Sequence, residues 1–298
     1  MELSDKLKEL NFGSVIPEPL MSHYTTYRVG GKALAIVSPY NTEELVKLIK
    51  YLKDNKINFK ILGNGSNLVF SSKGYDGVLI RLDYFDTFYL KNNELKVGAG
   101  YSLMRAAMKC SRLGLSGLEF ASGIPGSVGG AIFMNAGAYK SDMSQVVKSV
   151  TVLTPRYNVK TMSLKSLQFG YRDSYFHHHK DYVILQTTIK LNKGDAKEIM
   201  DTIQDRKIRR MASQPLEYPS AGSVFRNPEG MFAGALIEEL GLKGFKVGGA
   251  EVSTKHANFI INKDNATGDD VQELIYYVQK EVKDKKKVEL KIEQEIVR

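Results

Sequence analysis

The chain has few of the features that mark secreted, membrane-bound or disulfide-rich proteins. Its 298 residues include a single cysteine, Cys110, so no disulfide can form within the chain. Cys110 falls on the apolar face of a predicted helix, which favours a buried thiol over a nucleophile. No apolar run approaches the roughly 18 residues that a membrane-spanning helix needs. The N-terminal segment MELSDKLKELNFG lacks the apolar core of a signal peptide. We therefore expect a soluble, cytoplasmic protein without membrane insertion.

Basic residues are in excess, but no nucleic-acid motif accompanies them. The formal net charge is +9, yet the lysines and arginines are scattered and no aromatic-basic motif is present. The densest cluster, at 283–287, is typical of a helix end facing solvent. A basic cleft would attract a polyanionic small molecule such as a nucleotide-sugar or a dinucleotide. A basic nucleic-acid-binding module is the alternative that the charge alone leaves open.

The sequence has no clear pattern for a metal site or for an acyl-transfer nucleophile. The triplet at 177–179 is three consecutive histidines, which do not converge easily on one ion, and no second His or Cys cluster is present. We expect no metal site. No G-x-S-x-G motif surrounds Ser223, so we do not expect an acyl nucleophile, although its hydroxyl could give up a proton.

Glycine, by contrast, is dense in one stretch. Residues 117–139 read GLEFASGIPGSVGGAIFMNAGAY and contain only one ionised side chain, Glu119. Glycine weakens regular elements, so this density suggests close approach of a flat ligand to the backbone, or else a buried turn. Pro125 favours a turn, after which the amides of Gly126, Ser127 and Val128 are expected to converge on an anion.

A second glycine loop, GNGSN at 63–67, follows the predicted strand 59–62. Its amides and polar side chains suit a phosphate. A Rossmann fold needs a helix and a third glycine here, whereas the β-rich stretch LVFSSKGYDGVLIRL follows. We therefore expect a pyrophosphate cradle in an α+β domain. Arg28, beside the glycine pair at 30–31, either pairs with a phosphate or lies exposed.

Periodicity and capping signals predict the remaining elements. A helix capped by Asn41 is expected to bury Leu45, Leu48, Ile49 and Leu52, and another, stopped by Gly114, to bury Leu103, Ala106, Ala107 and Cys110. A last helix begins with a Thr267–Asp270 box. His256 is expected to be structural. We predict further strands at 33–38, 95–100, 148–154, 159–163, 183–191, 252–262 and 287–298, with helices from 195 and at 231–240.

Together these stretches resemble the UDP-N-acetylenolpyruvoylglucosamine reductase family. The resemblance rests on YRVGG, LGNGSNL, SGIPGSVGGAIFMNAGAY, FGYRDS, SAGSVFRNP, KHANFIIN and the tail glutamates, in order from about Tyr24. It implies an α+β fold: an FAD-binding domain of the vanillyl-alcohol-oxidase/PCMH type at 1–194, with subdomains of about 1–56 and 57–194. A substrate domain at 195–286 and a C-terminal strand at 287–298 would follow.

The resemblance also implies the site. Catalysis is expected from Arg172, Ser223 as proton donor, and Glu295. Substrate binding is expected from Tyr171, Arg226 and Asn227. The residues expected around FAD are Arg28, Gly63, Asn64, Gly65, Ser66, Asn67, Gly123, Ile124, Pro125, Gly126, Ser127, Gly129 and Gly130.

The implied reaction is reduction of UDP-N-acetylglucosamine enolpyruvate to UDP-N-acetylmuramate in peptidoglycan synthesis. FAD would be held noncovalently, NADPH would be the co-substrate, and a monomer is expected. Arg226 replaces the family's frequent lysine, and the tail IEQEIVR leaves Glu293 as an alternative to Glu295. The stretch from Arg172 to Val183 looks too short for one branch's extra tyrosine-bearing loop. An FAD-dependent oxidase of the same fold is the nearest alternative function.

Overall fold

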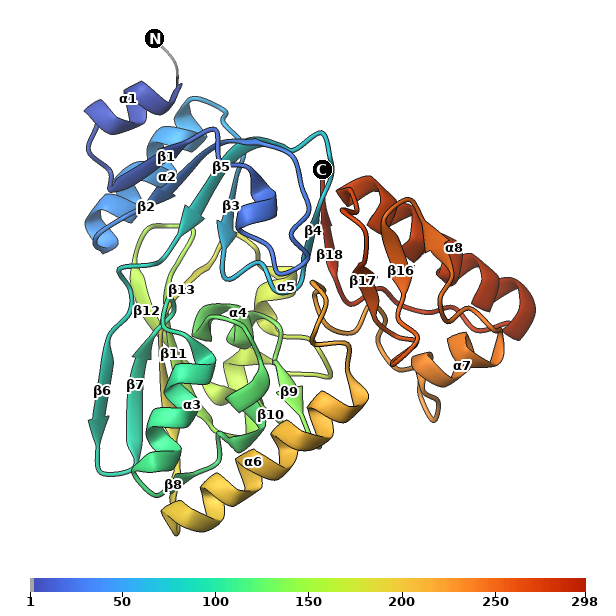
Figure 1. The fold of residues 1–298 in the computed structure, drawn as a ribbon. Coiled ribbons are helices and arrows are strands. Elements are labelled where there is room, and N and C mark those ends of the chain that lie inside the picture. The colour runs from blue at the N-terminus through green and yellow to red at the C-terminus, as the bar shows by residue number, and fades with distance from the viewer. Residues whose placement is uncertain (1–2) are drawn as a thin grey trace. The chain divides into compact units, whose positions relative to one another are not determined.

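The computed structural model describes residues 3–298 and divides into two compact units, each built from three chain segments (Figure 1). The first unit contains the chain up to Ile16, then Ile36–Asn64 and Leu79–Ile208. The second contains Pro17–Ala35, Gly65–Val78 and Arg209–Arg298. The expected domains 1–194, 195–286 and 287–298 are continuous segments, and their limits stay a prediction.

An antiparallel five-stranded sheet forms much of the first unit. Its order is β12-β11-β13-β7-β6, with β13 (Val183–Lys190) in the centre. The flanking strands are β11 (Val147–Leu153), β12 (Val159–Ser163), β7 (Glu94–Gly98) and β6 (Phe88–Lys91). Val183, Leu185 and Ile189 are buried, as expected for a strand rich in branched apolar residues. Helix α4 (Val128–Phe133) packs against β13 and β7, so the glycine-rich stretch is anchored on this sheet.

Two helices of the first unit confirm their sequence signals. Helix α2 (Thr42–Asp54) begins where the Asn41 side chain accepts a hydrogen bond from the Glu44 amide, and its four expected residues are buried. Helix α3 (Leu103–Arg112) buries Cys110, and burial raises the pKa of this thiol to about 11. Cys110 is therefore protonated and unreactive near neutral pH.

A four-stranded sheet has the order β1-β2-β5-β3, and the boundary between the units falls within β2 and β5. Its strands are β1 (Ser14–Pro17), β2 (Ala33–Ser38), β5 (Tyr75–Arg81) and β3 (Phe59–Leu62). After β3 the chain passes through the GNGSN loop into strand β4 (Leu68–Phe70). The absence of a helix at this point agrees with the rejection of a Rossmann fold.

The second unit is built on helix α8 (Gly268–Lys286), which packs on the antiparallel strands β15 (Lys246–Val247), β16 (Ala250–Val252) and β17 (Ile260–Asn262) (Figure 1). Thr267 and Asp270 form the expected capping box. Helix α7 (Ala233–Glu239) joins the same core. Strand β18 (Glu295–Val297) pairs in parallel with β4, so the C-terminal tail is part of the unit.

The remaining elements, most of them short, complete residues 3–298. They are α1 (Leu3–Glu9), β8 (Leu115–Ser116), β9 (Gly137–Ala138), β10 (Ser141–Asp142), α5 (Tyr175–His178), β14 (Asn192–Lys193), α6 (Ala196–Ser213) and four 3-10 turns, at Met21–His23, Glu119–Gly123, Met143–Gln145 and Leu164–Leu167. No helix in this range combines the length and apolar character required to cross a bilayer.

Two expected strands are wrong over most of their length. The stretch 252–262 is two strand ends joined by a turn, because the Ser253 hydroxyl accepts hydrogen bonds from the Lys255 and His256 amides. In 287–298 only β18 is a strand. Upstream of it the chain leaves α8 through Lys287 in the left-handed region, φ 60°, and forms one isolated bridge between Phe225 and Ile292.

Candidate functional site

Two glycine-bearing loops of the first unit come together as expected. The Asn64 side-chain amide donates to the Pro125 carbonyl at 3.3 Å. A Cβ added at Gly63 would lie 2.8 Å from the Ser127 hydroxyl and near no other residue within 4 Å. A Cβ added at Gly130 would also meet only that hydroxyl, at 3.3 Å. The Ser127 hydroxyl is therefore the only neighbouring group that crowds these two glycines, and the rest of the backbone surface there is uncovered, which suits a flat ligand such as a flavin.

The amides after Pro125 are arranged differently from the expectation. Gly126 donates to the Ile124 carbonyl and Val128 to the Tyr101 carbonyl, both at 2.9 Å. The prediction that these two amides converge on an anion is therefore wrong, because one donates within the turn itself and the other donates to the segment that connects β7 to α3. Ser127 instead caps α4, accepting from the Gly130 amide at 3.2 Å.

The second half of the GNGSN loop belongs to the second unit. Gly65 has φ +63°, and a Cβ there would collide with the Tyr24 carbonyl oxygen, so the loop needs glycine for its own packing. The Asn67 side chain donates to the Glu293 carbonyl at 3.1 Å, and the Asn67 backbone carbonyl accepts from the Glu295 amide at 2.9 Å. Close by, the Thr26 amide donates to Gly65, while the buried Thr26 hydroxyl has no partner within residues 3–298. An orphaned buried hydroxyl fits a site completed by a ligand.

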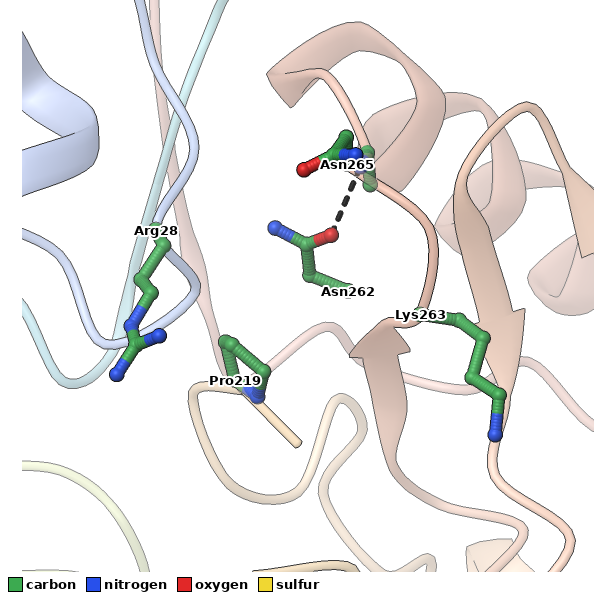
Figure 2. Close-up of a pocket in the computed structure, with 6 residues that line it drawn as sticks. Arg28, Pro219, Asn262, Lys263 and Asn265 are labelled. Carbon is green, nitrogen blue, oxygen red and sulfur yellow. Dashed lines mark hydrogen bonds between the residues drawn. The ribbon is translucent and has the colours of Figure 1, made fainter. Parts of the chain in front are cut away.

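Arg28 lines a polar pocket of about 290 Å³ within the second unit. It is exposed and sits at φ +56°, a conformation uncommon for residues other than glycine. Figure 2 shows the Asn262 side chain in the same pocket, where its carbonyl accepts from the Ala266 amide at 2.7 Å. The Asn262 side-chain nitrogen donates to the Tyr27 carbonyl at 3.0 Å, which ties the pocket wall to the YRVGG segment. The remaining residues that line the pocket are Pro219, Lys263, Asn265 and Ala266.

The loop carrying Arg172 is held by the glycine-rich run. Arg172 has φ +53°, and its guanidinium donates to the Gly137 carbonyl at 2.7 Å. The Asn135 side chain, 2% exposed, donates to the Gly170 carbonyl at 2.8 Å. The Ser174 hydroxyl donates to the Phe133 carbonyl at 2.6 Å. Tyr171 is exposed beside the guanidinium, whose carbon lies 5.2 Å from the ring centroid.

Two histidines of the triplet contact an aspartate of their own loop. Within residues 3–298 no group of three His, Cys, Asp or Glu side chains has the arrangement to hold an ion. His177 and His178 instead lie 3.2 Å and 3.3 Å from the Asp173 carboxylate oxygens, directly after Arg172. The triplet therefore shapes the end of the Arg172 loop.

The Ser223 loop is held on one side by Asn258, which the sequence analysis did not single out. The Asn258 side chain accepts from the Phe225 amide at 3.0 Å and donates to the Phe225 carbonyl at 2.8 Å. Its own amide donates to the Nδ1 atom of His256 at 3.2 Å. Burial lowers the pKa of His256, as expected for a structural histidine. Asn258 lies within the KHANFIIN stretch, which is the part of the sequence that could have drawn attention to it.

Arg226 and Asn227 follow Ser223 but differ in how they are held. The Arg226 amide donates to the Lys291 carbonyl at 2.8 Å, whereas its buried side-chain Nε has no partner in residues 3–298. An unpartnered guanidinium nitrogen fits an anionic ligand. Asn227 accepts from the Ala233 amide at 3.0 Å, so its carbonyl supports the start of α7.

The two tail glutamates lie on either side of Gln294. The Glu293 amide donates to the Val224 carbonyl at 2.8 Å, and Glu295 begins β18. Both are thus tied to the second unit, as is Ser223, whereas Arg172 belongs to the first.

Known proteins match this chain both in its separate domains and over almost its full length. Residues 33–163 match the family "FAD binding domain", and residues 214–297 match "UDP-N-acetylenolpyruvoylglucosamine reductase, C-terminal domain". The UDP-N-acetylenolpyruvoylglucosamine reductase of Caldanaerobacter subterraneus subsp. tengcongensis is 45% identical over 296 residues, covering 99% of this chain and 98% of the relative. The chain belongs to this reductase family.

Other reductases of the family agree over the same length. The one from Lactobacillus helveticus is 43% identical over 298 residues, 100% of this chain and 99% of the relative. The crystal structure of the reductase from Thermus caldophilus superposes with a TM-score of 0.81 at 35% identity, covering 96% and 98% of the two chains. The expected α+β fold with an FAD-binding domain and a C-terminal reductase domain is confirmed.

Proposed function

We propose that this protein reduces UDP-N-acetylglucosamine enolpyruvate to UDP-N-acetylmuramate in peptidoglycan precursor synthesis, with NADPH as the reductant and noncovalent FAD. The observation that carries the proposal is the full-length similarity, at 41–45% identity, to reductases named for the enolpyruvyl substrate. Bound FAD would supply hydride transfer between NADPH and the enol ether. The remaining chemistry falls to side chains of this chain.

The backbone at Gly63 and Gly130, where only the Ser127 hydroxyl stands close, supports a flavin-binding role for the two glycine loops. In this proposal the residues at 63–67 and at Gly123, Ile124, Pro125, Gly126, Ser127, Gly129 and Gly130 surround the cofactor, and Arg28 lies near its phosphates. The hydrogen bond from Asn64 to Pro125 keeps the two loops of the first unit at a fixed separation. The orphaned Thr26 hydroxyl supports a ligand contact beside Gly65.

Arg172 is proposed to bind the enolpyruvyl carboxylate and to stabilise charge that builds beside it, with Tyr171 contributing to substrate binding. A guanidinium fixed by the Gly137 carbonyl is preorganised for this role, because it need not reorient when the charge develops. Arg226 and Asn227 are proposed to bind the nucleotide-sugar. The unpartnered Nε of Arg226 supports the phosphate contact.

Ser223 is proposed to deliver the proton to the carbon next to the carboxylate, assisted by Glu295. A serine hydroxyl is a weak acid, so it can serve only where the acceptor carbon is strongly basic and neighbouring groups relieve the alkoxide. The tail contacts at Val224 and Asn67 keep Glu295 on the same unit as Ser223.

The proposal is tested on the purified protein. It should be yellow, and acid denaturation should release free FAD into the supernatant. NADPH consumption should then require UDP-N-acetylglucosamine enolpyruvate in equimolar amount. A protein that stays colourless after incubation with FAD, or NADPH consumption independent of the enolpyruvyl substrate, would exclude this function.

A further inference from the structure

A buried side-chain amide connects three segments of the second unit. Gln294 is 4% exposed and Tyr27 is fully buried. The Tyr27 hydroxyl donates to Gln294 Oε1 at 3.1 Å. Gln294 Nε2 shares its hydrogens among the carbonyls of Ala221 and Gly222, both at 3.2 Å, and Ser223, at 3.4 Å. The amide therefore links the YRVGG segment, the tail and the loop that bears Ser223.

Backbone hydrogen bonds fix the chain on either side of Gln294. The Glu293 amide donates to Val224 at 2.8 Å, and the Glu295 amide donates to Asn67 at 2.9 Å. Asn67 returns a side-chain hydrogen bond to the Glu293 carbonyl. With both neighbours fixed, the Gln294 side chain cannot follow a displaced loop and instead holds the loop in one position.

The loop needs such a donor. Three consecutive carbonyls, those of Ala221, Gly222 and Ser223, converge on one nitrogen, and their oxygens would repel one another without it. Gly222 has φ +76°, and a Cβ there would meet no atom within 4 Å, so side-chain packing does not fix this turn. Asn258 holds the loop only further on, at Val224 and Phe225.

We propose that Gln294 and Tyr27 are positioning residues, which set the Ser223 backbone so that its hydroxyl is aimed for proton delivery. This inference rests on the proposed function of Ser223. Neither side chain is assigned a contact with substrate or FAD. Burial raises the pKa of the Tyr27 phenol, so it stays a neutral donor throughout the physiological range. The Gln294 amide is then held in one orientation, with its nitrogen toward the loop.

Hydrogen exchange tests the positioning without any ligand or activity. In Tyr27→Phe and Gln294→Leu, the amides of Val224 and Phe225 keep their acceptors on Asn258. They should nevertheless exchange about 10-fold faster than in the wild type, because the loop opens more often when a hydrogen bond that holds it is lost. Gln272→Leu is the matched control, because Gln272 is also a buried glutamine of this unit, 7% exposed, but contacts Arg298. Unchanged exchange in both test variants would overturn the inference.

Kinetics then separate positioning from general damage. Both variants should slow reoxidation of the reduced flavin by UDP-N-acetylglucosamine enolpyruvate roughly 10- to 100-fold, as expected for a misplaced reacting group. Reduction of the flavin by NADPH should change less than about twofold, since Ser223 has no part in that step. The double variant should be no slower than Gln294→Leu, because Tyr27 acts through Gln294.

Equal slowing of both half-reactions, or additive effects in the double variant, would contradict the inference. The proposed function fails by a different result: wild-type protein whose reduced flavin is not reoxidised by the enolpyruvyl substrate. The exchange comparison still decides in that case whether the Gln294 amide positions the loop.

Discussion

Ser223 is the residue for which loop geometry matters most, because its proposed role is to deliver a proton and a serine hydroxyl is a weak acid. Its loop is held by Gln294 on one side and by Asn258 on the other. Ser223→Ala should slow reoxidation by the enolpyruvyl substrate by about 10²- to 10⁴-fold, the usual contribution of general acid catalysis. Single-turnover kinetics measure this directly.

Ser223→Cys is the companion variant, because a thiol can also donate a proton. It should retain more reoxidation activity than Ser223→Ala, while flavin reduction by NADPH stays near the wild-type rate in both. Equal losses in the two variants would indicate a structural hydroxyl. Wild-type reoxidation in the alanine variant would remove Ser223 from the chemistry.

His256 gives a prediction on pH and stability. Burial lowers its pKa below the ordinary value of 6.5, and its Nδ1 accepts a hydrogen bond from the Asn258 amide. The unfolded state therefore binds a proton that the folded state does not, so this contribution is present above pH 6.5 and is lost as pH falls through the folded pKa. His256→Gln should flatten the decline in unfolding free energy below pH 6.5 in denaturant titrations. An unchanged decline would show that His256 does not titrate between the two states.

Single residues also show the limit of sequence reasoning. Asn41, Thr267 and Asp270 were predictable because capping depends on neighbours in sequence. Gln294 and Tyr27 were not, because they are 267 positions apart and their hydrogen bond forms only in the folded unit. The amides of Gly126 and Val128 were misassigned because their acceptors depend on how the turn folds and packs.

At the scale of elements, the two glycines of the GNGSN loop should behave differently. Gly63→Ala displaces only the Ser127 hydroxyl, so the protein should stay folded while its flavin content falls. Gly65→Ala meets the Tyr24 carbonyl at a positive φ, so it should lower the melting temperature of the protein. Thermal melts and the ratio of flavin to protein absorbance measure the two effects.

The contrast between the two variants is the control. Full flavin content in a stable Gly63→Ala protein would show that the open backbone there does not face the cofactor. An undiminished melting temperature in Gly65→Ala would contradict the packing argument.

Helices with apolar stripes and caps were predicted well, as α2, α3 and α8 show. A 3.6-residue period of apolar side chains can be recognised within a short stretch of sequence. The stretches 252–262 and 287–298 were not predicted well. In the first stretch, local hydrogen bonds to the Ser253 hydroxyl form a turn that apolar alternation does not reveal. In the second, strand structure depends on pairing of β18 with the distant strand β4.

At the scale of the whole molecule, the chain passes repeatedly between its two units. The tail shows the consequence: residues at the end of the sequence pair with β4 and support the Ser223 loop. The motifs from YRVGG to the tail glutamates identified the family correctly, whereas the contacts that organise them became visible only in the structure.

Anaerobic stopped-flow spectroscopy tests the central claim most directly. The protein is reduced with one equivalent of NADPH and mixed either with UDP-N-acetylglucosamine enolpyruvate or with oxygenated buffer. We expect the enolpyruvyl substrate to restore the oxidised flavin spectrum in a single turnover, faster than oxygen does, with UDP-N-acetylmuramate as the product. Reoxidation by oxygen alone, with no response to the enolpyruvyl substrate, would contradict the reductase assignment and indicate an oxidase of the same fold.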